Sequence, residues 1–222
     1  GMALNVEANL TSMGADCTTL HNQEKIEKTR YVEESTNHLF IRIDSDESDI
    51  KRINKKYLTK KYLSQYDAVV ISDYDKGFLT FLDAISICSK FINKNIPVFV
   101  DSKKTDLRCY SGAIIKINQH EKSRVKNMPQ ESKLITTIGS QGAEYEGERF
   151  FPYETKVSDK HGHRDVCGAG DAFLAALVHR FLRNGKNIKE AIDFSNKCAA
   201  IVVGYFGTRS INLKDLKEEG IK

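Results

Sequence analysis

The stretch from residue 68 to residue 138 contains four short runs of apolar residues, each bounded by polar or turn-forming residues. Runs of this length, rich in Val and Ile, are typical of parallel strands buried on both faces of a sheet. Phe81, Ile85 and Cys88 lie between the first two runs, on one face of a predicted helix. Strands that alternate with helices predict βαβ units, and therefore an α/β fold with a mostly parallel sheet. The runs are Ala68–Ile71, Pro97–Asp101, Ala113–Ile117 and Leu134–Ile138.

Further elements are expected on both sides of these runs. Segments near each end of the chain carry apolar residues at helical spacing, and two short N-terminal segments alternate as strands do. No repeat, low-complexity segment or linker interrupts the chain, so we expect one domain over residues 1–222. The predicted elements are helices at 4–13, 50–58, 172–183 and 188–205, strands at 29–32 and 39–43, and hairpin-like pieces at 143–145 and 149–152.

The composition excludes several classes of function. A net charge of +4 on 222 residues is too small to require nucleic acid or an anionic membrane as a partner. No segment approaches the roughly 18 consecutive apolar residues of a membrane span. The 5 cysteines contain no CxxC pair, which argues against a disulfide framework and for a reducing compartment. We therefore expect a cytoplasmic protein. Gly1 ahead of Met2 resembles a residue left by tag removal.

The segment DVCGAGDAF, residues 165–173, stands directly before a predicted amphipathic helix. Gly168 and Gly170 allow the backbone to turn tightly and to present consecutive N–H groups at the start of the helix. A helix N-terminus carries about half a positive charge, so it suits an anion. The same field favours the ionised carboxylate of Asp171, which can then accept a proton from a hydroxyl. On local physics alone, an ordinary glycine-rich helix start explains the segment equally well.

Competing motifs for phosphate and for metal do not match this chain. No GxxxxGK[ST] segment occurs, which excludes a Walker A loop, and Phe173 stands where a Rossmann fingerprint needs its third glycine. His161, His163 and Cys167 lack both the spacing and the fourth ligand of a zinc site. We therefore interpret the histidine segment as a mobile loop.

Asn118 and Glu121 directly follow the third apolar run. At the carboxyl end of a parallel strand, an amide and a carboxylate with this spacing can hold a hydrated Mg²⁺ against phosphates. A structural alternative is equally open, in which Asn118 caps a helix and Glu121 completes a capping box.

Other polar residues also follow predicted strands. Gly139, Ser140 and Gly142 can place their backbone against a nucleotide phosphate, and a tight turn explains the same residues without a ligand. Lys76 and Lys103 follow strand ends, where α/β sheets bind ligands. Each lysine is predicted either to contact phosphate or to be solvated.

Together these segments resemble the ribokinase-like (PfkB) sugar kinases. DVCGAGDAF is similar to the C-terminal signature of that family, and NQHE is similar to its NxxE magnesium motif. Within the family, the segments VVISDYDKGFLT, VFVDSKKTDLRCYSGAIIKINQHE and KTRYV followed by LFIRID are similar to the heptose-7-phosphate kinase domain of ADP-heptose synthesis. GMALNVEANL resembles the GGxxNVAxNL segment on the sugar side. The resemblance implies a three-layer α/β/α ribokinase-like fold.

The resemblance also implies ATP-dependent phosphoryl transfer to a sugar hydroxyl, with a role for each matching residue. Asp171 would take the hydroxyl proton, and the backbone amides of Gly168, Ala169 and Gly170 would form an anion hole for the γ-phosphoryl group. Asn118 and Glu121 would organise Mg²⁺ through water. The implied nucleotide-side residues are Lys103, Gly139, Ser140, Gly142 and Asn196, and the implied sugar-side residues are Asn5, Lys28 and Lys76.

The same resemblance predicts an incomplete sugar side. The Gly-Asp strand with which family members begin has no counterpart, and the chain is shorter between Leu20 and Lys28. We therefore expect a chain truncated at its N-terminus, with residues 1–45 a remnant of the sugar-side and lid region and residues 65–222 the nucleotide-binding core. Heptose 7-phosphate is the preferred acceptor. The alternatives are another sugar, a nucleoside, or a non-catalytic remnant that binds nucleotide only; dimerisation through the lid, common in the family, implies a homodimer.

Overall fold

The computed structural model describes residues 2–24, 26–33, 38–45, 50–54, 56, 65–155, 165–205, 207–211 and 213–221. Parts of two predictions lie outside these ranges. Tyr57 and Leu58 of the expected surface helix lie outside the described residues. His161 and His163, from the segment interpreted as a mobile loop, lie outside them as well.

A six-stranded sheet lies at the centre of the described part of the chain, with the strand order β3-β4-β5-β6-β7-β8. The first four of these strands are parallel to one another, and the last two continue the sheet in antiparallel pairing. The predicted mostly parallel sheet is therefore confirmed. The strands are β3 (Val69–Asp73), β4 (Val98–Ser102), β5 (Ile114–Asn118), β6 (Lys133–Thr137), β7 (Ala143–Tyr145) and β8 (Glu148–Phe150).

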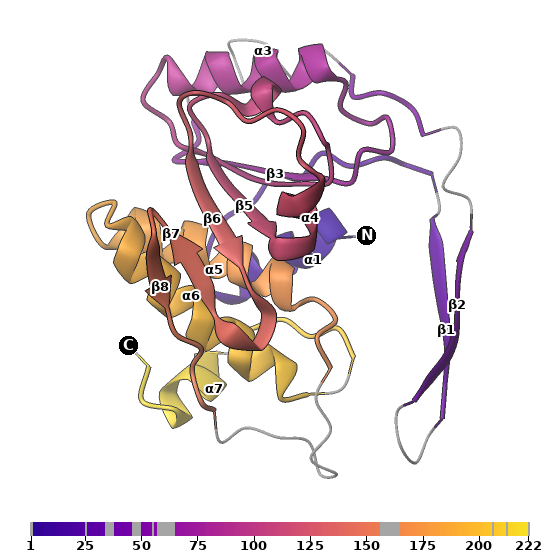
Figure 1. Cartoon of the computed structure of the whole chain (residues 1–222), viewed down its shortest axis with the longest axis vertical. Helices are drawn as coiled ribbons and strands as arrows, with labels where there is room; N and C mark the ends of the chain where they lie inside the picture. Colours follow the sequence, from indigo (N-terminus) through magenta and orange to yellow (C-terminus); the bar gives the residue numbers. More distant parts are fainter. Residues whose placement is uncertain are drawn as a thin grey trace.

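Helices cover both faces of the sheet, which gives the predicted three layers (Figure 1). One face carries α3 (Phe81–Ile92) and the short η2 (Arg108–Tyr110). The other carries α1 (Met2–Ser12), α5 (Ala169–Arg183) and α6 (Ile188–Val203). Other helices of the described residues are α4 (Gln119–Arg124), η3 (Gly139–Gln141) and α7 (Leu213–Glu218).

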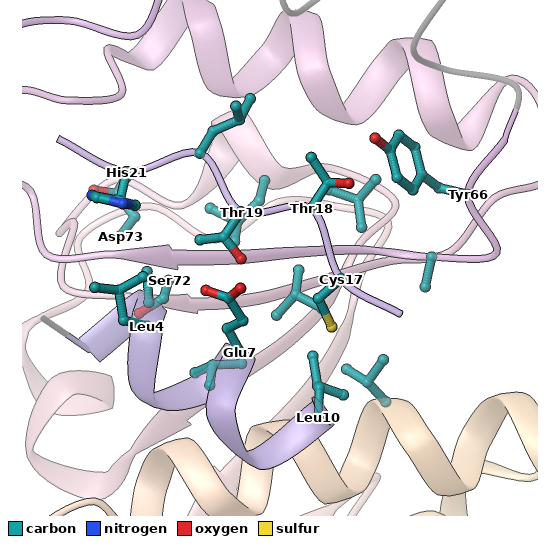
Figure 2. Close-up of a pocket in the computed structure, with 18 of the residues that line it drawn as sticks. Leu4, Glu7, Leu10, Cys17, Thr18, Thr19, His21, Tyr66, Ser72 and Asp73 are labelled. Carbon is teal, nitrogen blue, oxygen red and sulfur yellow. The ribbon is translucent and has the colours of Figure 1, made fainter. Parts of the chain in front are cut away.

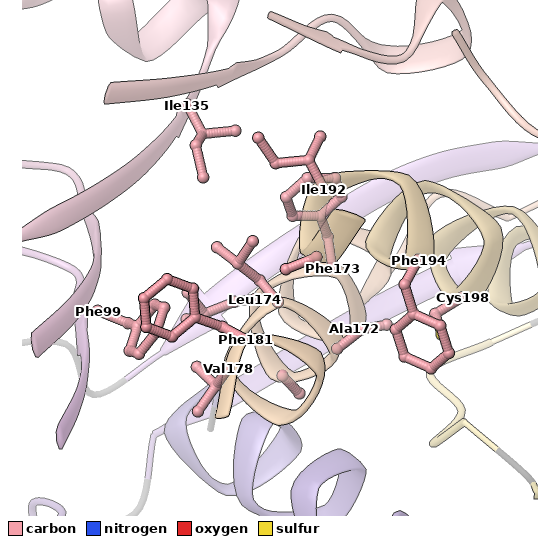
Figure 3. Close-up of a cluster of buried hydrophobic side chains, with 14 of the residues drawn as sticks. Phe99, Ile135, Ala172, Phe173, Leu174, Val178, Phe181, Ile192, Phe194 and Cys198 are labelled. Atoms are coloured by element: carbon pink, nitrogen blue, oxygen red, sulfur yellow. The ribbon is translucent and has the colours of Figure 1, made fainter. Parts of the chain in front are cut away.

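Strand β4 shows why the apolar runs fold between two helical layers. All five of its residues are buried, and neighbouring side chains point to opposite faces of the sheet. Phe99 packs into the cluster formed with α5 and α6, where its ring meets that of Phe181 edge to face at 5.3 Å (Figure 3). Val98 and Val100 pack into the cluster below α3. A strand without a polar face is stable only where both faces are covered.

Two helix predictions need correction. α5 begins at Ala169, three residues before the predicted Ala172, because Gly168 adopts a left-handed conformation (φ 82°) that turns the chain into the helix. Residues 50–54 are not helical, although a surface helix was predicted from Ile50. Ile53 is buried and its amide donates to the Phe78 carbonyl, so tertiary contacts determine the conformation of this segment.

The predicted N-terminal strands form β1 (Glu27–Val32) and β2 (Leu39–Ser45), an antiparallel ribbon that stands apart from the sheet and helices (Figure 1). On one face Lys28 lies opposite Asp44, and Arg30 lies opposite Arg42. The other face is largely apolar and exposed, with Tyr31, Ile41 and Ile43 at 54%, 52% and 44% exposure. The ribbon therefore has one cationic and one apolar face.

A cavity of about 1880 Å³ lies beside β3, the edge strand of the sheet (Figure 2). Glu7 of α1 and Thr19 of the segment after α1 point toward each other across it. Lys28 and Lys76 also line its wall. Among the described residues, no helix combines the length and apolarity that crossing a membrane requires.

Gly142 permits a contact that any side chain would block. Its φ of 93° and ψ of −133° lie in a region that only glycine adopts readily, and an added Cβ would lie 2.0 Å from the Phe150 carbonyl oxygen. Gly147 also has a positive φ (77°), but a Cβ there would meet no atom within 4 Å. A side chain at Gly147 would therefore meet backbone strain alone, whereas a side chain at Gly142 would meet both strain and a steric clash.

We predict that Gly147→Ala lowers the free energy of unfolding by about 1–2 kcal/mol, the cost of a left-handed alanine. Gly142→Ala should cost clearly more, because the strand β8 must also move away from residue 142. Urea denaturation of both variants measures the difference. Equal losses of unfolding free energy in the two variants would show that the close approach of β8 to residue 142 does not affect stability.

Candidate active site

The first turn of α5 presents unused backbone donors. Among the three amides of the predicted anion hole, that of Ala169 donates to the Val166 carbonyl at 3.2 Å. The amides of Gly168 and Gly170 have no acceptor within the described residues. Gly168 is the N-cap and Gly170 lies in the first turn of a 15-residue helix, where the helix dipole favours negative charge. The geometry therefore leaves two of the three predicted donors available to an anion.

Asp171 follows these amides and is only 2% exposed. The side chain of Asn5, 166 residues away on α1, donates to its Oδ2 at 2.7 Å. Burial above all raises the pKa of Asp171 to about 6, and the Asp101 carboxylate acts in the same direction, whereas the Asn5 hydrogen bond and the charges of Lys116 and Lys103 oppose the shift. A carboxylate with this pKa is ionised near neutral pH and remains basic enough to accept a proton.

Asn5 is itself held in place by α1. The side chain of Asn9 donates to the Asn5 carbonyl at 2.7 Å, and its own Oδ1 accepts from the Ile211 amide at 2.8 Å. Asn9 is fully buried, so these bonds are protected from water. The predicted sugar-side residue Asn5 thus lies at the Asp171 carboxylate, and Asn9 holds its backbone.

A buried ion pair beside Asp171 was missed by the sequence analysis. Lys116 of β5 and Asp101 of β4 are register partners, and the Lys116 Nζ lies 2.7 Å from the Asp101 Oδ2. A Cβ added to Gly170 would be 3.0 Å from that same Nζ, so the ammonium lies against the first turn of α5. The signal was present in the sequence, because each charged residue belongs to an apolar strand run.

Asn118 and Glu121 form the capping box that was the structural alternative for this motif. The Asn118 side chain accepts from the Glu121 amide, and the Glu121 side chain accepts from the Asn118 amide, both at 2.8 Å. Glu121 is 8% exposed and its other carboxylate oxygen contacts the ammonium of Lys103. The Lys103 Nζ also lies over the ring of Tyr74, 5.3 Å from its centroid. Capping therefore fixes the carboxylate beside Lys103.

The loop after β3 brings Tyr74 and Lys76 to the same region. Ion pairs hold this loop, since the buried Lys104 Nζ pairs with the buried Asp73 at 3.2 Å and with the exposed Asp75 at 2.5 Å. Burial raises the pKa of Tyr74, as do the carboxylates of Asp171 and Asp101, whereas the charge of Arg42 lowers it. Tyr74 therefore lies within electrostatic range of both the buried carboxylate and the ribbon.

Two of the residues predicted to contact nucleotide, Gly142 and Asn196, lie against the end of β8. Gly139 and Ser140 belong to η3, a tight turn closed by a hydrogen bond from the Gly142 amide to the Gly139 carbonyl at 3.2 Å. Asn196 of α6 donates to the carbonyls of Phe150 and Phe151 at 3.2 and 3.1 Å. The structure thus gives Gly142 and Asn196 a role in holding the chain after β8. Their ligand roles stay predictions.

The arrangement has a definite chemical capacity. It joins a basic carboxylate, two unused amides, and two ammonium groups near the carboxyl ends of parallel strands. No group of three or more His, Cys, Asp or Glu in the described residues has the geometry of a metal site. Such a site can stabilise a multiply charged anion while a neighbouring hydroxyl loses its proton.

Comparison with known proteins agrees with this capacity. The family model described as pfkB family carbohydrate kinase matches residues 5–215. The "Bifunctional protein HldE" of a Nitratiruptor species is 30% identical over 220 residues, covering 89% of this chain and 46% of the relative. That of Sulfurimonas denitrificans is 34% identical over 182 residues, covering 71% of this chain and 36% of the relative. The chain thus spans about half or less of the length of these two relatives.

Solved structures share the fold. Phosphofructokinase-2 from Escherichia coli in complex with potassium matches with a TM-score of 0.71 at 15% identity, covering 97% of this chain and 84% of that chain. Arabidopsis thaliana ribokinase complexed with ribose and ATP matches with a TM-score of 0.55 at 17% identity, covering 75% of this chain and 59% of that chain. The predicted ribokinase-like fold is therefore confirmed.

We predict that Asp171→Asn stabilises the protein at pH 8. The folded-state pKa of about 6 lies above the ordinary value of 3.8, so the stability associated with the neutral carboxyl is lost as the pH rises through 6. Removing the charge should raise the free energy of unfolding by about 2–3 kcal/mol at pH 8 and by much less near pH 4. Urea denaturation at both values measures this, and a gain that is equal at the two pH values would contradict it.

Proposed function

The chain belongs to the pfkB family of carbohydrate kinases, and from this premise we propose that it transfers the γ-phosphoryl group of ATP to a hydroxyl of a sugar phosphate. The observation that carries the proposal is Asp171, buried in the first turn of α5 beside unused amides and hydrogen-bonded to Asn5. A helix start without a function does not require a buried carboxylate with a raised pKa.

In the proposed reaction, Asp171 accepts the proton of the acceptor hydroxyl. The hydroxyl oxygen forms a bond to the γ-phosphorus, the bond from that phosphorus to the β–γ bridging oxygen breaks, and ADP leaves with the electron pair. The amides of Gly168 and Gly170 and the ammonium of Lys116 stabilise the charge on the migrating group. Positioning and charge stabilisation supply most of the catalysis in such transfers, so few side chains suffice.

A divalent cation fits this site only in a largely hydrated form. Glu121 is the one carboxylate of the NxxE motif, and one of its oxygens is already used in the capping box. Mg²⁺ keeps several waters and is bound through one or two carboxylates together with substrate phosphates, which matches this donor set. When bound, Mg²⁺ would neutralise phosphate charge. Asn118 and Glu121 would hold its waters, and Gly139, Ser140 and Asn196 would lie along the nucleotide.

The acceptor would bind between the ribbon and α1. Lys28, Tyr74 and Lys76 line the cavity beside β3, and Asn5 lies at the other side of α1 with its amide on Asp171. The segments that resemble the heptose-7-phosphate kinase domain favour heptose 7-phosphate as the acceptor. A homodimer through the lid, as the family resemblance implies, stays a prediction.

The cationic face of the ribbon supports an acceptor that already carries a phosphate. Lys28, Arg30 and Arg42 share this face with a single carboxylate, Asp44, which pairs with Lys28 at 3.1 Å and with Arg42 at 2.7 Å. Arg30 lies directly opposite Arg42, and like charges in opposite positions of a strand pair destabilise the pairing. A phosphate between the two guanidinium groups would remove that repulsion.

A direct test of the function is ADP release over a panel of sugars and sugar phosphates. We predict release above the no-sugar background for at least one sugar phosphate. Asp171→Asn should lower kcat about 10²–10⁴-fold with ATP affinity retained, because it removes only the base. Asp193→Asn, an exposed carboxylate on α6, is the matched control and should behave as the wild type.

Two outcomes would contradict the assignment. An unchanged kcat in Asp171→Asn rejects the catalytic base. Nucleotide binding without ADP release for any acceptor favours the alternative of a non-catalytic nucleotide-binding protein.

For the ribbon we predict that Arg30→Gln raises the KM for the sugar phosphate about tenfold or more, the loss of one charge-assisted hydrogen bond. The KM for ATP should not change. Arg108→Gln, an exposed arginine paired with Asp106 on η2, controls for the loss of one positive charge. Equal effects of the two substitutions on the KM for the sugar phosphate would show that the ribbon does not select the acceptor.

A further inference from the structure

Lys103 occupies the oxygen of Glu121 that a metal-bound water would need. One carboxylate oxygen of Glu121 accepts from the Asn118 amide at 2.8 Å, and the other contacts the Lys103 ammonium. Glu121 is 8% exposed, so this ammonium is the cation that compensates a nearly dry carboxylate. In the described structure, Lys103 therefore occupies the position at Glu121 that a cation or its water would take.

The main chain of Lys103 is fixed, whereas its side chain can move. Lys103 follows β4 directly, and its amide donates to the Asp73 carbonyl at 2.8 Å. Its side chain retains 33% exposure and is bounded on one side by the ring of Tyr74. An ammonium that slides over an aromatic face keeps part of its stabilisation as it moves.

A moving ammonium needs another anion as its partner. Asp101, near the end of β4, is already paired with Lys116 at 2.7 Å. Asp171 is buried and accepts from Asn5. Both carboxylates lie within electrostatic range of Lys103, but each already has a donor of its own. The phosphates of a bound nucleotide would supply the missing partner.

We propose that Lys103 is an internal counterion that masks Glu121 until a nucleotide arrives together with a divalent cation. The cation then takes the place of the ammonium at Glu121, and the ammonium moves along Tyr74 to the phosphates. This inference rests on the proposed nucleotide and metal site but not on turnover. It makes metal and nucleotide bind cooperatively, because each removes the cost of displacing Lys103 for the other.

Mn²⁺ binding to the nucleotide-free protein tests this directly, because electron paramagnetic resonance counts free Mn²⁺ and Mn²⁺ suits oxygen ligands as Mg²⁺ does. We expect weak binding to the wild type and at least a tenfold lower Kd in Lys103→Met. Lys103→Gln keeps a donor for Glu121 without the charge and should show the same gain. Lys122→Met, an exposed lysine of α4, is the matched control and should show none.

The double variant Lys103→Met with Glu121→Gln should not show the gain in Mn²⁺ affinity. That loss would locate the added Mn²⁺ binding at Glu121. Thermal unfolding verifies that each variant is folded; if Lys103→Met is not, Lys103→Gln decides. A Kd for Mn²⁺ that is unchanged or raised in the folded charge-removing variant overturns the inference, whatever the kinase assay gives. An increase in Mn²⁺ affinity together with no ADP release would instead support the masked site and contradict only the proposed activity.

Discussion

The hydrogen bond between Asn5 and Asp171 is the interaction on which the site depends, because it joins the first helix of the chain to the start of α5. A carboxylate that is 2% exposed needs a donor, or its burial would be too costly. The same burial makes Asp171 a stronger base than an exposed aspartate. Packing of α1 against α5 therefore determines both where the carboxylate lies and how readily it takes up a proton.

Parallel pairing explains why so many charges meet in this region. The carboxyl ends of β3, β4 and β5 lie side by side, so residues that end each strand become neighbours although they are far apart in sequence. Asp101 pairs with Lys116 across two strands, and Glu121 contacts Lys103 from the helix that follows β5. Each buried carboxylate of these pairs has its own cation, which keeps the arrangement stable in the absence of a ligand.

The sequence predicted the elements better than the contacts between them. Apolar periodicity located β3 to β6 and α3, and the glycines located the turn before α5, because these signals are local. The predicted start of α5, Ala172, is three residues later than the observed start, Ala169. The pattern of apolar residues begins only after the first turn. The Asp101–Lys116 pair and the Asn5–Asp171 bond depend on strand register and on helix packing, which one sequence without its fold does not reveal. Residues 50–54 show the opposite failure, where tertiary contacts outweighed a local helical pattern.

The two sides of the site differ in how strongly the fold constrains them. The first turn of α5 is continuous with a helix whose residues fill the core, so changes there alter the packing around Phe173 and Leu174 (Figure 3). The strands of the ribbon pair with each other, many of their side chains are exposed, and the ribbon stands apart from the sheet and helices (Figure 1). Substitutions on its cationic face cost little stability. In the proposed function, substitutions in the ribbon would therefore change the preference for the acceptor, while the core would hold the transfer chemistry constant.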